Sequence, residues 1–134
     1  STLSKAPSKP DWSRLVADSI LQHGAWHTYL KLVEARGPYP DDLSRLGYTE
    51  ILRNTIVRDF LSHPKAMQAV PKLTPEFLSN FDRFNLTAQE GYLMSLIDGR
   101  LDLQKLQILS PFDQFTTLFN LAKLQHERAI TVPQ

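Results

Sequence analysis

Apolar residues recur at helical spacing along most of the chain. They predict a helix over residues 11–36 that is interrupted at Gly24, a short helix over residues 42–47, and a longer helix that begins after Thr49 and ends near His63. In the longer helix, apolar residues return every three or four positions, which is the spacing of one helix face. The first half of the chain is therefore expected to be mostly helical.

The second half of the chain is punctuated by residues that start and stop helices. The start signals are Thr74 before Pro75, Thr87 with Glu90 three residues later, Asp102, and Ser110 before Pro111. Gly99 is expected to end the second of these four helices in a left-handed conformation. The last helix is expected to be the longest, and β-favouring residues at 129–132 predict a short terminal strand.

These elements predict an all-α fold class, namely a compact multi-helix domain whose C-terminal third resembles a helix-turn-helix or winged helix. Residues 1–10 are rich in Ser, Lys and Pro, and we expect them to form a flexible tail or linker. Residues 11–72 are expected to form an N-terminal helical subdomain. Residues 73–134 are expected to form a C-terminal one.

Composition and charge narrow the classes of function. The 134 residues are 42% hydrophobic and 22% charged, which is typical of globular domains, and no apolar run is long enough to span a bilayer. The absence of cysteine excludes disulfides and thiolate sites, and with no recognisable secretion signal we expect a cytoplasmic protein. Residues 85–134 carry 4 Lys and Arg against 5 Asp and Glu, so they lack the concentrated basic face of a DNA-wrapping domain.

The most specific motif is LTAQEGYLMSLIDG, from Leu86 to Gly99. It resembles the L-T-x-x-E-G-x-L-x-S-x-I-D-G opening of a winged-helix-like module of bacterial multi-domain signalling proteins and of J-domain proteins of gliding and predatory bacteria. Ser110-Pro111 and the apolar stripe that follows are similar to the next long helix of that module. The resemblance covers about residues 84–132.

Two positions differ from the module. Arg100-Leu101-Asp102 stands where a β-branched or hydroxyl residue usually opens the short helix, and Glu127-Arg128-Ala129 stands where a glycine usually precedes the final strand. The resemblance implies a regulatory or adaptor role beside neighbouring domains, and it implies no catalytic residue.

Two groups of residues are candidates for partner binding. The outward positions of the last helix include Gln114, Thr117 and Asn120, which are mostly uncharged and therefore poor readers of DNA. The other group is aromatic, because large aromatics dominate interface hot spots. It consists of Trp12, Trp26, Tyr29 and Tyr39, for which packing in the core is the competing interpretation.

Other polar groups have simpler interpretations. His23 and His27 have metal-ligand spacing if the helix continues through Gly24, but no third ligand lies nearby, so solvent-facing or hydrogen-bonded histidines are favoured and no metal site is expected. The pair Asp41-Asp42 follows two prolines and is typical of a turn. No catalytic signature or phosphate-binding loop occurs in the sequence, so we expect no enzyme and no cofactor.

Three hypotheses about function remain. The leading one is a non-catalytic adaptor domain of a bacterial signalling or regulatory protein, which docks a protein partner or a neighbouring domain of a longer chain. A DNA-binding transcriptional regulator is the second. The third is a small-molecule sensor, with the ligand between the two helical halves beside the N-terminal aromatics.

Overall fold

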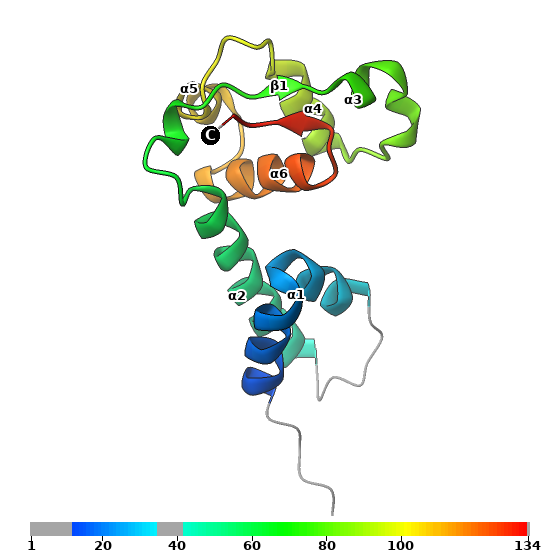
Figure 1. The fold of residues 1–134 in the computed structure, drawn as a ribbon, viewed down its shortest axis with the longest axis vertical. Coiled ribbons are helices and arrows are strands. Elements are labelled where there is room, and N and C mark those ends of the chain that lie inside the picture. Colours follow the sequence, from blue (N-terminus) through cyan, green and yellow to red (C-terminus); the bar gives the residue numbers. More distant parts are fainter. Residues whose placement is uncertain (1–11, 35–41, 134) are drawn as a thin grey trace, which may run out of the picture. The chain divides into compact units, whose positions relative to one another are not determined.

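The computed structural model describes residues 12–34 and 42–133, and these residues form mainly α-helices (Figure 1). The prediction of a mostly helical chain is confirmed. The chain divides into two compact units, Ser1–Ile56 and Val57–Gln134, which we call the N-terminal and C-terminal units. The division falls at residues 56 and 57, earlier than the boundary at residues 72 and 73 that the sequence predicts.

The described part of the N-terminal unit consists of helix α1 (Trp12–Glu34) and most of helix α2 (Asp42–Phe60). α1 is broken at Gly24, as the sequence predicts. α2 is one continuous helix where two were expected, because a glycine such as Gly47 inside a helix costs only about 1 kcal/mol relative to alanine. The buried apolar residues of this unit are Val16, Ala25, Leu32, Leu52 and Ile56.

The C-terminal unit begins in the last turn of α2 and contains eight further elements. They are η1 (Ala66–Gln68), β1 (Lys72–Leu73), α3 (Pro75–Ser79), η2 (Phe81–Arg83), α4 (Ala88–Leu96), α5 (Leu103–Leu109), α6 (Gln114–His126) and β2 (Ile130–Thr131). The predicted order of a short helix, three more helices with the last the longest, and a terminal strand is confirmed.

Three of the predicted helix start signals form the expected caps. The Thr87 side chain accepts a hydrogen bond from the Glu90 amide at 3.1 Å, and the Glu90 carboxylate accepts one from the Thr87 amide at 2.8 Å, which completes a capping box. Asp102 caps α5 by accepting from the Lys105 amide at 2.8 Å. Thr74 caps α3 in the same way.

The start of α6 was predicted incorrectly at Ser110-Pro111. The helix begins at Gln114, and its cap is Asp113, which accepts a hydrogen bond from the Thr116 amide at 2.7 Å. Ser110 instead forms a turn, in which its hydroxyl accepts from the Phe112 amide at 3.1 Å. Both Ser110 and Asp113 are good capping residues, and the sequence pattern alone does not choose between them.

A two-stranded antiparallel sheet pairs β1, which precedes α3, with β2, which follows α6 (Figure 1). Its register pairs Lys72 with Thr131 and Leu73 with Ile130. The terminal strand β2 was predicted, but its partner β1 was not, because a two-residue strand is too short to show an alternating pattern.

A cluster of buried residues, which we call the C-terminal core, holds the unit together. It consists of Phe84, Leu93, Met94, Ile97, Leu103, Leu106, Leu121, Leu124, Ala129, Ile130 and Val132. Phe60, Leu61, Met67 and Leu73 pack against it. Phe60, Leu61 and Met67 precede residue 73 and yet pack on this core, so the C-terminal unit includes the end of α2. This packing explains why the division of the chain falls earlier than the sequence predicts.

The turn after α6 is a Schellman motif with arginine at the left-handed position. The Arg128 backbone has φ of 65°, and among the described residues it is the one non-glycine residue with positive φ. The Ala129 amide donates to the Leu124 carbonyl at 2.9 Å, and the Arg128 amide donates to the Gln125 carbonyl at 3.0 Å. Glycine usually occupies this position in such a turn because it pays no steric penalty there.

Candidate functional site

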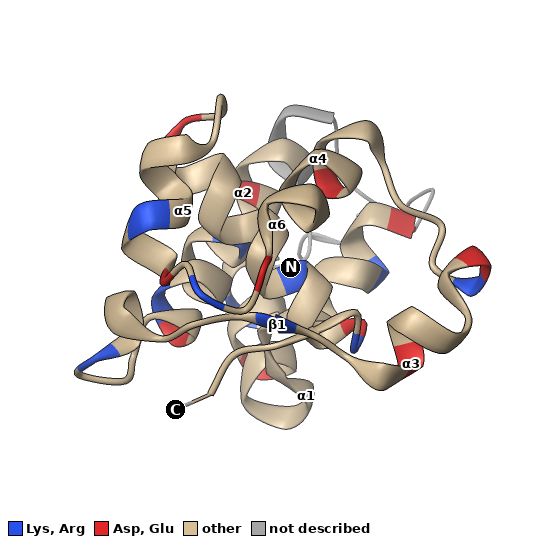
Figure 2. Cartoon of the chain, turned by 90° about the horizontal axis from the view of Figure 1, so that it is seen from above, with Lys and Arg blue, Asp and Glu red and all other residues tan. Residues whose placement is uncertain are grey.

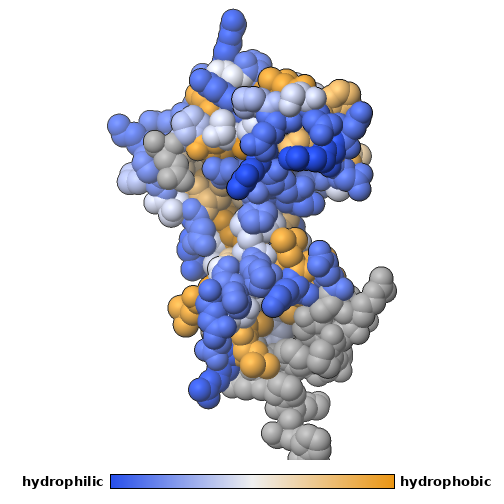
Figure 3. Space-filling model, turned by 45° about the vertical axis from the view of Figure 1, so that its right-hand side comes forward, coloured by the Kyte–Doolittle hydropathy of each residue, from blue (hydrophilic) through white to orange (hydrophobic). Residues whose placement is uncertain are grey.

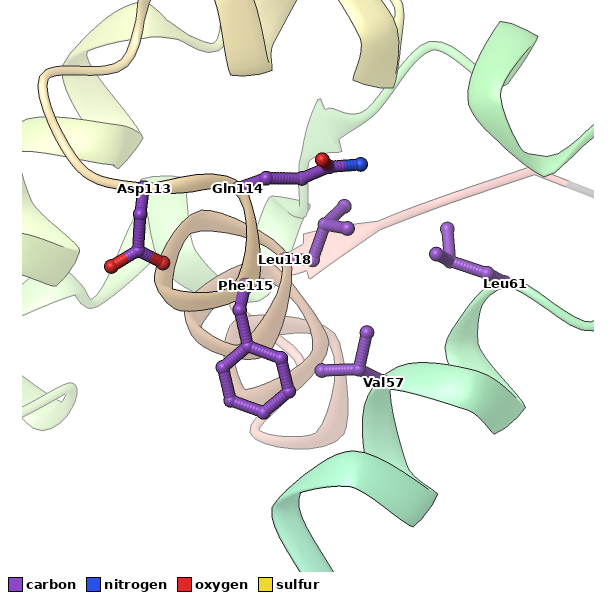
Figure 4. Close-up of a pocket in the computed structure, with 6 residues that line it drawn as sticks. All are labelled: Val57, Leu61, Asp113, Gln114, Phe115 and Leu118. Carbon is purple, nitrogen blue, oxygen red and sulfur yellow. The ribbon is translucent and has the colours of Figure 1, made fainter. Parts of the chain in front are cut away.

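An open hollow with mainly apolar walls lies in the C-terminal unit (Figure 4). Its volume is about 480 Å³. The residues that line it are Val57, Leu61, Asp113, Gln114, Phe115 and Leu118. Val57 lies in the last turn of α2 and Leu61 directly follows this helix, whereas the other four come from the cap and first two turns of α6.

The first turns of α6 set the shape of this hollow. Asp113 fixes the start of the helix because its carboxylate accepts hydrogen bonds from both the amide and the hydroxyl of Thr116, at 2.7 and 3.1 Å. The half-buried ring of Phe115 stacks on Phe119, with 6.5 Å between ring centroids and an interplanar angle of 8°. The apolar wall therefore rests on a capped helix and a stacked ring pair.

A second hollow shares Gln114 with the first. It has a volume of about 520 Å³ and is lined by Met67, Gln104, Gln107, Ile108 and Gln114. The Gln107 side-chain amide is engaged there, since it donates to the Leu103 carbonyl and to the Met67 sulfur, both at 3.3 Å. Glutamine side chains give this hollow a more polar lining than the first one has.

The three residues predicted on the outward side of the last helix differ in their placement. Gln114 is exposed and lines both hollows, as an outward position should. Thr117 and Asn120 are buried, so the prediction that they face outward is wrong. The Thr117 hydroxyl is 2.7 Å from that of Ser110, and the Asn120 amide donates to the Thr116 carbonyl at 2.9 Å, so both side chains make internal polar contacts.

The predicted aromatic group is only partly described by the structure. Trp26 and Tyr29 lie half-buried on α1, with their rings in an edge-to-face arrangement at 5.8 Å between centroids. Trp12 begins α1, but its side chain lies outside the described part of the chain, and so does the whole of Tyr39. Half-burial fits both interpretations of Trp26 and Tyr29, which therefore stay candidates for partner binding.

The C-terminal unit does not show the charge pattern of a DNA-binding surface. Residues 57–134 contain eight Lys and Arg and eight Asp and Glu, and Figure 2 shows the two signs scattered over the elements. Lys123 is the one Lys or Arg of α6, and its ammonium group lies 3.4 Å from the Glu90 carboxylate and 4.0 Å from that of Glu127. A recognition helix needs cations that reach phosphates and bases, whereas Lys123 contacts two carboxylates of its own unit.

The Glu90 carboxylate is an ionisable group at the centre of the packing. Its residue is 1% exposed, one of its oxygens completes the capping box of α4, and the other faces the Lys123 ammonium. Burial raises the pKa of the neighbouring Glu127, and the charge of Glu90 raises it further, while Lys123 acts in the opposite direction. The cluster ties α4 to α6, so we assign it a structural role.

The end of the LTAQEGYLMSLIDG motif also has a structural explanation. The Asp98 carboxylate accepts hydrogen bonds from the Arg100 amide at 2.8 Å and the Leu101 amide at 3.1 Å, and these bonds lower its pKa. Gly99 has φ of 79°, which glycine adopts without strain. These two residues turn the chain from α4 towards α5, so the fold explains why aspartate and glycine end the motif.

Exposed apolar side chains occur in both units, and Figure 3 shows several among the polar side chains of one face. In the C-terminal unit they are Leu78, Phe81, Tyr92, Ile108 and Leu109. Ile108, which is 76% exposed, belongs to the second hollow and enlarges the apolar surface next to Gln114. The two hollows and this side chain form the candidate interaction surface of the C-terminal unit.

Within the described ranges, no three His, Cys, Asp or Glu side chains gather closely enough to hold a metal ion. None of the described helices combines the length and apolarity needed to cross a membrane. Comparisons with protein-family models, with curated proteins and with solved structures found no match to this chain.

Proposed function

We propose that this chain is a non-catalytic interaction domain of a cytoplasmic bacterial signalling or regulatory protein. In this proposal it docks a protein partner or a neighbouring domain through the hollow between the end of α2 and the start of α6. The observation that carries the proposal is the lining of that hollow, in which Val57, Leu61, Phe115 and Leu118 supply the walls. The bacterial regulatory setting rests on the resemblance of residues 84–132 to the winged-helix-like module.

The chemistry of the hollow favours a side chain of a protein over a small polar metabolite. A metabolite site usually has several polar groups that converge on the ligand, whereas the polar groups here are Asp113, which caps α6, and Gln114 at the rim. An open apolar groove beside a helix is the usual receptor for the apolar face of another helix. Phe115 would serve as the aromatic anchor, since aromatic residues dominate such interfaces.

Site-specific photocrosslinking tests this proposal. A photoreactive phenylalanine derivative placed at Gln114, which is exposed at the rim of the hollow, should capture a discrete polypeptide, or a neighbouring domain if the chain is part of a longer protein. The matched control carries the same derivative at Gln22, an exposed glutamine of α1. Substituting Leu61→Ala removes part of the wall and should lower the yield from position 114 in a domain that circular dichroism shows to be folded.

Equal capture from positions 114 and 22 would contradict the proposal, because it would mean that contact is non-specific. The same conclusion follows if capture from position 114 is unaffected by Leu61→Ala. No cross-link at all from position 114 in cells that express the natural protein would also count against it.

The DNA-binding regulator and the small-molecule sensor remain alternative hypotheses. A DNA-binding regulator is disfavoured because Lys123 is paired with Glu90 and the C-terminal unit has balanced charge. A gel-shift titration at low and moderate salt should give no complex at either concentration. The sensor hypothesis concerns a ligand between the two helical halves, and thermal-shift screening against metabolites is its direct test.

A further inference from the structure

The break in α1 has a geometry that glycine alone adopts readily. Gly24 has φ of 85° and ψ of 162°, a region that other residues essentially do not occupy. A Cβ atom at this position would meet nothing within 4 Å, so the requirement for glycine comes from the backbone conformation and not from a lack of space.

Two hydroxyl groups hold this break in place. The Thr28 hydroxyl donates to the Gly24 carbonyl at 3.1 Å, and the Ser19 and Thr28 hydroxyl oxygens are 2.8 Å apart. Thr28 is buried, and both contacts are partly buried. Ser19 precedes the break and Thr28 follows it, and their contact fixes the relative orientation of the two segments of α1.

Two exposed imidazole rings lie side by side, one from each side of the break. The ring centroids of His23 and His27 are 4.6 Å apart, with an angle of 42° between the ring planes, and both residues are exposed. Their four-residue spacing would bring them together on a regular helix. The structure brings them together although the helix is interrupted between them, and no sequence rule predicts that outcome.

Two exposed imidazole rings therefore lie close together on α1. The neutral imidazole is the form that binds metals. Two nitrogens on one metal ion, each at about 2.1 Å from it, lie at most about 4 Å apart, which rings this close can reach by rotating their side chains.

We propose that His23 and His27 form a two-ligand surface site for a divalent first-row transition metal, with Cu²⁺ bound most tightly. Imidazole suits copper, nickel and zinc, and affinity for a nitrogen site generally rises to Cu²⁺ and falls again at Zn²⁺. Because no third metal-binding side chain joins the pair within the described residues, water or a donor from another molecule completes the coordination. This site is independent of the hollow in the C-terminal unit.

The chain contains four histidines, so it supplies its own controls. Isothermal titration calorimetry at neutral pH should show that Cu²⁺ binds more tightly than either Ni²⁺ or Zn²⁺. His23→Gln and His27→Gln should each weaken Cu²⁺ binding by about tenfold or more, because each removes one of two ligands. His63→Gln, in the C-terminal unit, and His126→Gln, in α6, should change it less than about twofold.

Electron paramagnetic resonance gives a second readout that does not depend on affinity. The Cu²⁺ spectrum should show coupling to two imidazole nitrogens, reduced to one in either single variant. The proposal is overturned if the double variant His23→Gln/His27→Gln binds Cu²⁺ as tightly as the unmodified chain. It is also overturned if His63→Gln or His126→Gln costs as much affinity as His27→Gln does. Circular dichroism on each variant excludes unfolding as the cause of a loss.

Discussion

The Thr74 hydroxyl donates a hydrogen bond to the Arg128 carbonyl at 2.6 Å and also lies 3.2 Å from the Ala129 carbonyl, across 54 residues of sequence. The same hydroxyl oxygen accepts from the Phe77 amide at 3.1 Å. One side chain therefore caps α3 and holds the turn that follows α6. The start of α3 and the turn after α6 are joined at this point, next to the β1–β2 pair.

Replacing Thr74 with valine should destabilise the C-terminal unit by about 2–3 kcal/mol, because it removes a helix cap and a buried hydrogen bond together. Thr74→Ser keeps the hydroxyl and should cost less than about 1 kcal/mol. Hydrogen exchange of the amides in β1 and β2, followed by mass spectrometry, measures the difference. Equal protection in the two variants would show that the hydroxyl contributes little.

Arg128→Gly should stabilise the protein. Left-handed backbone costs a non-glycine residue about 1–2 kcal/mol, and the greater freedom of glycine in the unfolded chain returns part of this, so a net gain of about 0.5–1 kcal/mol is expected. Arg128→Val should be destabilising, because a β-branched residue tolerates this conformation poorly. Urea denaturation of the three proteins orders them, and a glycine variant less stable than the parent would contradict the interpretation of this turn.

The Glu90 and Lys123 pair should behave as one energetic unit. Lys123→Met leaves a carboxylate that is almost fully buried without its cation, and we expect a loss of about 1–3 kcal/mol, reduced by water because the Lys123 side chain is 32% exposed. Glu90→Gln keeps the capping geometry and should cost less. The double variant should be more stable than the sum of the single losses predicts, and strict additivity in a double-mutant cycle would exclude the pairing.

Glu127 predicts a pH dependence with a definite sign. Its folded-state pKa is raised above the ordinary value of 4.5, so the folded protein binds this proton more readily than the unfolded chain does. The corresponding stability is fully present below pH 4.5 and is lost as the pH rises through the higher folded-state value. Glu127→Gln should therefore be more stable than the parent at pH 7, by less than about 1 kcal/mol for so exposed a side chain.

Denaturation curves of Glu127→Gln and the parent at several pH values check this sign. The stability difference should shrink as the pH falls below the folded-state pKa. A variant that is less stable than the parent at pH 7 would mean that the Lys123 ion pair outweighs burial at this position.

Local signals in the sequence were sufficient for much of the fold. The capping box joins Thr87 and Glu90, which are three residues apart, so its pattern can be read directly from the sequence and predicts a real helix start. The break at Gly24 and the turn at Gly99 were predictable for the same reason. Features that depend on distant residues were not predictable. β1 exists because β2 pairs with it, and Lys72-Leu73 alone carries no strand signal.

The candidate interaction surface was only partly accessible to sequence reasoning. Gln114 was identified as an outward residue, but helical spacing also placed Thr117 and Asn120 outward, and both are buried. A helix covered on more than one side buries polar residues that satisfy each other, as Thr117 does with Ser110, and a single apolar stripe gives no sign of this. Val57 and Leu61 read as ordinary core residues of the helix that the sequence predicts to end near His63, because nothing local shows that they border a hollow.

The division of the chain inside α2 bears on how the protein can be cut into pieces. A recombinant fragment that begins at residue 57 keeps Phe60, Leu61 and Met67 over the C-terminal core, whereas one that begins at residue 73 exposes the surface they cover. The longer fragment should melt cooperatively and the shorter one should aggregate or melt without a clear transition. A fragment that is cut in the proline-flanked segment before β1 would therefore also lack part of the wall of the proposed partner-binding hollow.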